Sequence, residues 1–120
     1  MSKKQRKTNY QKEWRLKNPE MVKGHWLRKY WTNVSWKEAL NNFNELVAKQ
    51  NNLCAICNVP ESGIEAKTRK IRDLSVDHDH STNAVRGLLC SRCNRAIGYL
   101  KDDSSLCFRA GEYLKKHELP

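Results

Sequence analysis

The chain has 120 residues, with 23 Lys and Arg against 13 Asp and Glu, and its formal net charge is +10. Only 38% of the residues are hydrophobic. No apolar run approaches the ~18 residues of a membrane-spanning helix, and the first twenty residues lack the apolar core of a secretory signal. A small domain this polar buries a thin core and typically needs a metal, a disulfide or a partner for stability.

The positive charge is concentrated in the first part of the sequence. Residues 1–50 carry 12 basic and 4 acidic side chains, whereas residues 51–120 carry 11 and 9. This excess favours an anionic polymer as partner, and the lack of a clean amphipathic anchor favours nucleic acid over a membrane. We therefore expect a basic, mostly helical DNA-binding extension over residues 1–50 and a second domain over residues 51–120.

The first 50 residues are predicted to be helical after a flexible tail. Residues 1–10 are basic and show no periodicity, so they are predicted to form the tail. Asn18-Pro19-Glu20 is a helix start, with Asn as cap and Pro at the first helical position. Ser35 and Glu38 form a capping box for a second helix that ends near Gln50.

Four tryptophans lie in this helical part, and two roles are open for them. They are expected to be core and helix-packing anchors, because aromatic residues dominate small cores. The alternative is contact with DNA or with a protein partner. The residues are Trp14, Trp26, Trp31 and Trp36.

The second part alternates turns with short strands and helices. Residues 59–72 are polar and predict an irregular loop or a short hairpin. Alternating apolar residues predict two strands, and helical spacing predicts two helices after them. The strands are expected at residues 74–78 and 84–89, and the helices at residues 94–100 and about 104–117.

Five cysteines are present, and four of them form two Cys-x-x-Cys pairs separated by 32 residues. No signal peptide is expected, so a metal or redox role outranks disulfides. Four thiolates at this spacing predict one structural zinc ion, with iron as a less favoured metal and a redox pair or unrelated buried cysteines as alternatives. The predicted ligands are Cys54, Cys57, Cys90 and Cys93, and Cys107 is expected to be a small buried hydrophobe.

A second polar cluster, Asp77-His78-Asp79-His80, lies between the two cysteine pairs in the sequence. In a strand, the two Asp side chains face one side and the two His side chains face the other. Asn94 directly follows the last zinc ligand, so a zinc ion would fix its position. Carboxylate and amide oxygens suit a hard divalent cation, and a neutral His can take a proton from water. In a basic protein, this combination predicts phosphodiester hydrolysis.

The segment Cys54–Cys57 and the stretch LSVDHDHSTNAVRGLLCSRCNRAIGYLKDD from Leu74 to Asp103 closely resemble the phage recombination endonuclease VII family. That family belongs to the HNH, or ββα-metal, nucleases. The resemblance implies that Asp77 and Asn94 bind the catalytic divalent metal and that His78 is the general base. It implies that His80 assists at the scissile phosphate or the metal. The family's junction-resolving prototype has an acidic residue where this sequence has Ile97.

The resemblance also implies an overall fold and a set of partners. We expect an α+β protein in which basic N-terminal helices precede a small zinc-stabilised ββα-metal (HNH) nuclease module over residues 51–120, closed by a C-terminal helix. The implied cofactors are one structural Zn²⁺ per chain and a catalytic Mg²⁺ or another divalent cation such as Mn²⁺. The expected protein is phage-encoded, acts in the bacterial host cytoplasm as a monomer or homodimer, and does not bind a membrane.

DNA is the expected partner, and seven basic residues are candidates for contacts with its backbone. For Arg86, a surface charge and a phosphate clamp are equally open. Two other functions remain as alternatives: a zinc-stabilised DNA-binding module without catalysis, and a zinc-stabilised protein-interaction domain. The candidate DNA-contact residues are Lys3, Lys4, Arg6, Lys7, Arg86, Arg92 and Arg95.

Overall fold

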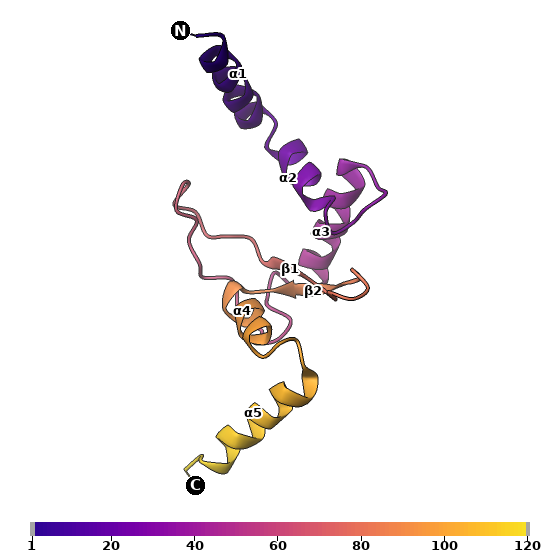
Figure 1. The fold of residues 1–120 in the computed structure, drawn as a ribbon, viewed down its shortest axis with the longest axis vertical. Coiled ribbons are helices and arrows are strands. Elements are labelled where there is room, and N and C mark those ends of the chain that lie inside the picture. The colour runs from indigo at the N-terminus through magenta and orange to yellow at the C-terminus, as the bar shows by residue number, and fades with distance from the viewer. Residues whose placement is uncertain (1, 120) are drawn as a thin grey trace. The chain divides into compact units, whose positions relative to one another are not determined.

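The computed structural model describes residues 2–119, which contain helices and one two-stranded sheet (Figure 1). This composition confirms the predicted α+β fold class. The helices in that range are α1 (Lys3–Lys17), α2 (Pro19–Leu27), α3 (Trp36–Lys49), α4 (Ser91–Tyr99) and α5 (Ser104–Lys116), and the strands are β1 (Ser75–His78) and β2 (Val85–Leu89).

The chain divides into two compact units. The first contains the sequence through Lys49 together with His78–Val85, and the second contains Gln50–Asp77 together with the sequence from Arg86 onward. The first unit therefore holds α1, α2, α3 and the turn of the hairpin. The second unit holds most of β1 and β2, followed by α4 and α5.

Helix α1 corrects the prediction of a flexible tail. Ser2 caps it: the Ser2 hydroxyl accepts from the Gln5 backbone N–H at 3.1 Å, and the Gln5 side chain accepts from the Ser2 N–H at 3.0 Å. This capping box starts a helix that buries none of its residues. The prediction failed because it relied on an apolar face, which this helix does not have.

Helices α2 and α3 form the packed part of the first unit. α2 begins at Pro19 as predicted, although the Asn18 side chain donates to the Trp14 carbonyl instead of capping α2. Ser35 accepts from the Glu38 N–H at 3.1 Å, as expected for the start of α3. The core between the two helices consists of Leu27, Ala39 and Phe43.

The tryptophans are less buried than predicted. The exposed fractions of Trp14 and Trp26 are 39% and 54%, so neither is a core anchor. Trp36 is half-buried and covers Gly24 of α2, where a Cβ atom would clash with the Trp36 carbonyl oxygen. The expectation of a core role therefore fails for at least two of the four side chains.

The second unit has its own small core. Its buried side chains are Cys54, Leu74, Val76, Leu88, Leu89 and Cys90. The loop over residues 59–72 is a short hairpin closed by a single antiparallel bridge between Ile64 and Ile71. Both strands and α5 lie where the sequence predicts them, whereas α4 begins three residues before the predicted start. Within residues 2–119, no helix is both long and apolar enough to cross a membrane.

Candidate metal centre and active site

The four predicted zinc ligands lie together in the second unit. The sulfur atoms of Cys54, Cys57, Cys90 and Cys93 are all within 4.8 Å of one another. A tetrahedron with Zn–S bonds of ~2.3 Å has S–S edges of roughly 3.8 Å. The Cys57 and Cys90 sulfurs are 3.8 Å apart, so the cluster can hold one tetrahedral zinc ion.

Each cysteine pair forms a tight turn in which backbone N–H groups point at a sulfur. The Ile56 N–H donates to the Cys54 sulfur and the Cys93 N–H donates to the Cys90 sulfur, both at 3.4 Å. Burial opposes ionisation of Cys54 and raises its pKa. Hydrogen bonds from backbone N–H groups outweigh this effect and lower the pKa of the thiol from 9.0 to about 6; the donors belong to Cys57, Cys90 and Ile56. The Cys54 thiolate is therefore readily formed, whereas burial and the neighbouring thiols raise the pKa of Cys93 to about 12, so a bound metal ion would have to displace the Cys93 proton.

Cys90 has a second role as the cap of α4. Its sulfur accepts the Cys93 N–H in the position where Ser or Asp usually caps a helix. This explains why α4 begins at Ser91, three residues before the predicted start. Asn94 is thus in the first turn of α4 and not at its opening residue; it is half-buried and its N–H donates to the Cys90 carbonyl at 2.9 Å.

The buried carboxylate of Glu61 also binds the first residue of α4. Glu61 is 8% exposed and accepts from the Ser91 N–H at 2.6 Å, the Ser91 hydroxyl at 2.8 Å and the Gly63 N–H at 2.8 Å. Burial alone would raise the pKa of Glu61, but these donors lower it below 4.5. The carboxylate is therefore ionised at neutral pH and fixes the start of the helix that carries Asn94.

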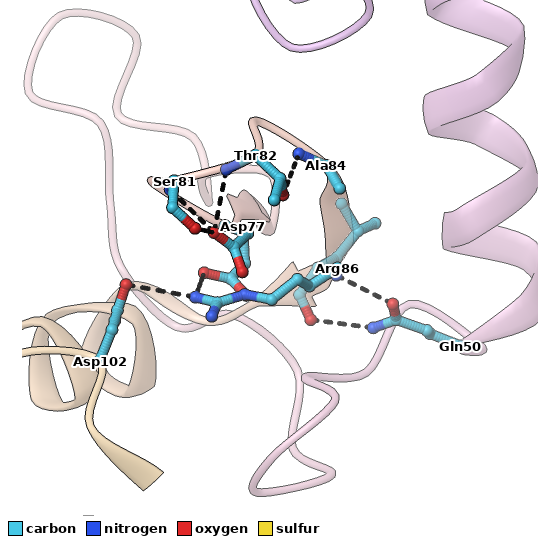
Figure 2. Close-up of polar contacts among 9 residues, drawn as sticks. Gln50, Asp77, Ser81, Thr82, Ala84, Arg86 and Asp102 are labelled. Atoms are coloured by element: carbon cyan, nitrogen blue, oxygen red, sulfur yellow. Dashed lines mark hydrogen bonds and ion pairs between the residues drawn. The ribbon is translucent and has the colours of Figure 1, made fainter.

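The Gln50 side chain anchors β2 at a residue near the zinc cluster. Its Oε1 accepts from the Leu88 N–H and its Nε2 donates to the Leu88 carbonyl, each at 2.9 Å. Nε2 also donates to the Leu53 carbonyl. The amide thus pairs with the edge of β2 as a neighbouring strand would (Figure 2), and the Leu88 carbonyl also accepts from the Ala55 N–H at 3.0 Å.

Asp77 of β1 forms a bidentate ion pair with Arg86 of β2. The Arg86 Nε and Nη2 atoms lie 2.7 and 2.9 Å from the two carboxylate oxygens (Figure 2). The same Nη2 is 3.4 Å from Asp102, in the loop after α4. Arg86 is thus an exposed residue that is also a cross-strand partner of the predicted metal ligand, and its contact with a phosphate stays a prediction.

The two histidines lie in the first unit. The His78 and His80 rings have centroids 4.7 Å apart, which confirms that they share one side of the chain. The Tyr30 ring lies 5.5 Å from His78 and 5.5 Å from Trp26. Asp79 has a different role, because its Oδ1 accepts from Ser81 and from the Thr82 N–H and so shapes the hairpin turn.

The remaining predicted residues are basic and exposed. Arg92 lies beside the zinc cluster, where a hydrogen bond to Cys57 raises its pKa. Arg95 is one helical turn further along α4. The four basic residues of the first turns of α1 are Lys3, Lys4, Arg6 and Lys7.

Four residues of this region were not predicted as site residues. Tyr30 was not singled out in the sequence, and Gln50 was predicted only as the end of a helix. Glu61 lies in a polar stretch that resembles a loop, and Asp102 follows a helix of ordinary composition. Cys107, in contrast, was predicted to be buried and is only half-buried.

Comparison with known proteins identifies related phage sequences. A family model described as recombination endonuclease VII matches residues 27–116. The Gene 59 protein of Mycobacterium phage D29 is 43% identical over 68 residues, which are 56% of this chain and 37% of that protein. The Gene 59 protein of Mycobacterium phage L5 is 46% identical over 66 residues, which are 54% and 36% of the two chains. The matches thus span little more than a third of these relatives, and no solved structure matches significantly.

Proposed function

This chain belongs to the recombination endonuclease VII family, and on that premise we propose that it is a metal-dependent DNA endonuclease that hydrolyses phosphodiester bonds. The observation that carries the proposal is the extent of the family match. It covers the whole run from the first cysteine pair through β1, β2 and α4, and so includes Asp77, His78 and Asn94. The order β1, β2, α4 is that of a ββα-metal (HNH) nuclease module.

Asp77 and Asn94 are the proposed ligands of the catalytic divalent cation, Mg²⁺ or Mn²⁺. The donor set fits such an ion, because both side chains offer hard oxygen atoms. The Asp77 carboxylate is 12% exposed and already holds a cation, the guanidinium of Arg86, with both oxygens. When bound, a divalent ion would stabilise the negative charge that develops on the phosphate and the leaving oxygen.

His78 is the proposed general base, and it directly follows Asp77 in β1. A neutral imidazole nitrogen would take a proton from the attacking water while the water oxygen forms a bond to phosphorus and the bond from phosphorus to the leaving oxygen breaks. The imidazole contacts two other rings, with centroid distances of 5.5 Å to Tyr30 and 4.7 Å to His80, and these contacts restrict its orientation. His80 is the proposed contact to the scissile phosphate.

We further propose that residues 1–50 bind the DNA backbone and that residues 51–120 form the zinc-bound nuclease domain. α1 presents seven basic side chains and one acidic side chain along an exposed helix. Phosphate neutralisation by such residues gives affinity without sequence preference. Because both relatives are phage proteins, the proposed setting is the cytoplasm of a bacterial host, with the protein acting as a monomer or a homodimer.

The test is cleavage of plasmid, branched and single-stranded DNA by the purified full chain with Mg²⁺, Mn²⁺, Ni²⁺ or Co²⁺. His78→Ala should lower the cleavage rate by the ~10²–10⁴-fold typical of losing a general base, while DNA affinity and zinc content stay unchanged. Asp77→Ala and Asn94→Ala should be partly rescued by more divalent ion. The matched control is His117→Ala, at the end of α5, which should cleave at the wild-type rate.

Two results would contradict this function. Cleavage by His78→Ala at the wild-type rate would remove the proposed mechanism. If the wild-type protein binds these DNA forms but cleaves none of them with any of the four ions, the chain is a zinc-stabilised DNA-binding module without catalysis.

A further inference from the structure

Arg86 is shared between two carboxylates of the second unit. It pairs with both oxygens of Asp77 at 2.7 and 2.9 Å, and its Nη2 also lies 3.4 Å from an Asp102 oxygen. The Asp77 and Asp102 side chains are 12% and 22% exposed, and that of Arg86 is 37% exposed. Figure 2 shows the guanidinium between the two carboxylates.

The loop after α4 is shaped to place Asp102 in this position. Lys101 and Asp102 both have left-handed backbone conformations, with φ angles of 59° and 54°. The Asp102 N–H donates to the Ile97 carbonyl at 2.8 Å, and Asp103 caps α5 immediately afterwards. Two consecutive non-glycine residues at positive φ cost backbone energy. The surrounding contacts must therefore stabilise the loop conformation that directs Asp102 to Arg86.

The ion pair and a metal ion need the same oxygen atoms. Asp77 offers two oxygens, and Arg86 occupies both of them. Each oxygen keeps a second lone pair, but a divalent cation bound there would be repelled by the guanidinium at close range, so the ion binds more tightly when Arg86 moves away. Asp102 is already in contact with Arg86 and can keep the guanidinium paired when Asp77 is taken.

We propose that Arg86 competes with the divalent ion for Asp77, and that Asp102 holds the displaced guanidinium when the ion binds. Arg86 and Asp102 are then positioning residues that set the affinity of the catalytic metal. This inference rests on the proposed function, because it takes Asp77 to be a metal ligand. Neither residue needs to contact the reacting atoms.

The proposal gives the two residues opposite effects on metal affinity. Without Arg86, the ion no longer has to displace a bidentate partner, so it binds more tightly. Without the Asp102 charge, the guanidinium has only Asp77 as partner, so the ion binds more weakly. For a partly exposed bidentate pair, each effect should be about 3- to 10-fold in Kd.

The experiment measures Mn²⁺ binding to the zinc-loaded full chain without DNA, by the loss of the electron paramagnetic resonance signal of free Mn²⁺. Arg86→Gln should lower the Kd for Mn²⁺, and Arg86→Lys should give an intermediate value, because Lys keeps the charge but not the bidentate geometry. Arg109→Gln on α5 makes the same charge change outside this cluster and is the matched control. Circular dichroism and zinc content establish that each variant is folded.

Asp102→Asn tests the second half of the proposal. Asn tolerates a left-handed backbone, so the loop is kept while the charge is lost. This variant should raise the Kd for Mn²⁺ in the wild-type background and change it less than about 2-fold in the Arg86→Gln background. An equal effect in both backgrounds would show that Asp102 acts on the metal directly and would overturn its assigned role.

Asp77→Asn separates failure of this inference from failure of the proposed function. If Asp77→Asn weakens Mn²⁺ binding but Arg86→Gln leaves it unchanged or weakens it, the metal site stands and the competition is refuted. If Asp77→Asn binds Mn²⁺ as the wild type does, Asp77 is not a ligand, and both the proposed metal site and the competition are wrong.

Discussion

The buried carboxylate of Glu61 should contribute more to stability than any other acidic group of its loop. In Glu61→Gln, one acceptor oxygen becomes an NH₂ group, which faces the Ser91 N–H if it replaces Oε2, or the Ser91 hydroxyl and the Gly63 N–H if it replaces Oε1. A hydrogen bond to a charged group contributes ~1.5–3 kcal/mol, so losing at least one of the three should lower the free energy of unfolding by about 2–3 kcal/mol. Thermal unfolding at fixed free zinc concentration measures the change.

The matched control for this experiment is Glu65→Gln, an exposed residue of the same loop. It should change the free energy of unfolding by less than about 0.5 kcal/mol. The pKa of Glu61 is lower in the folded protein than its ordinary 4.5, so its contribution is complete at neutral pH and disappears as the pH falls through the folded value. Equal unfolding midpoints for the two variants near pH 7 would refute the role assigned to Glu61.

Three further predictions concern the metal, the aromatic support and the basic helix. Cys90→Ser keeps a helix cap but loses a thiolate, so metal analysis should find no zinc and circular dichroism should show loss of the second unit's structure. The control Cys107→Ser should retain the zinc ion and the structure. Tyr30→Phe should cleave DNA at the wild-type rate, because the ring and not the hydroxyl packs on His78. Tyr30→Ala should cleave roughly 10- to 100-fold more slowly. Cleavage by Tyr30→Ala at the wild-type rate would exclude this packing role. Replacing Lys3, Lys4, Arg6 and Lys7 of α1 with Gln should make DNA affinity less dependent on salt. The slope of log affinity against log salt concentration should decrease by up to ~0.9 for each phosphate that is no longer neutralised, as measured by fluorescence anisotropy against the wild type.

Elements whose signals are local were predictable from the sequence. Ser35 with Glu38 and the Pro19 start depend on contacts within one helical turn, and both helices begin where these signals place them. The zinc cluster was predictable because its ligands form two pairs of fixed spacing. α1 was missed because a charged helix without a buried face gives no periodic signal, although its Ser2 capping box is visible in the sequence.

Contacts that depend on how distant segments fold were not predictable. Asp77 and Arg86 meet only because β1 and β2 pair, and Asp102 joins them only through a left-handed loop. Glu61 lies 30 residues before Ser91, and nothing in its neighbourhood marks it as buried. Cys90 was predicted as a zinc ligand but not as a cap, because sulfur is not among the usual capping groups.

These contacts connect the zinc cluster to the proposed catalytic ligand through a single helical turn. Cys90 is a proposed zinc ligand and the cap of α4. Glu61 binds Ser91 at the first position of α4, and the Asn94 N–H donates to the Cys90 carbonyl. An Asn side chain ligates a metal well only if its backbone is fixed to within a fraction of an ångström. A zinc ion bound at this turn would therefore support the proposed reaction without touching substrate, by holding Asn94 in place.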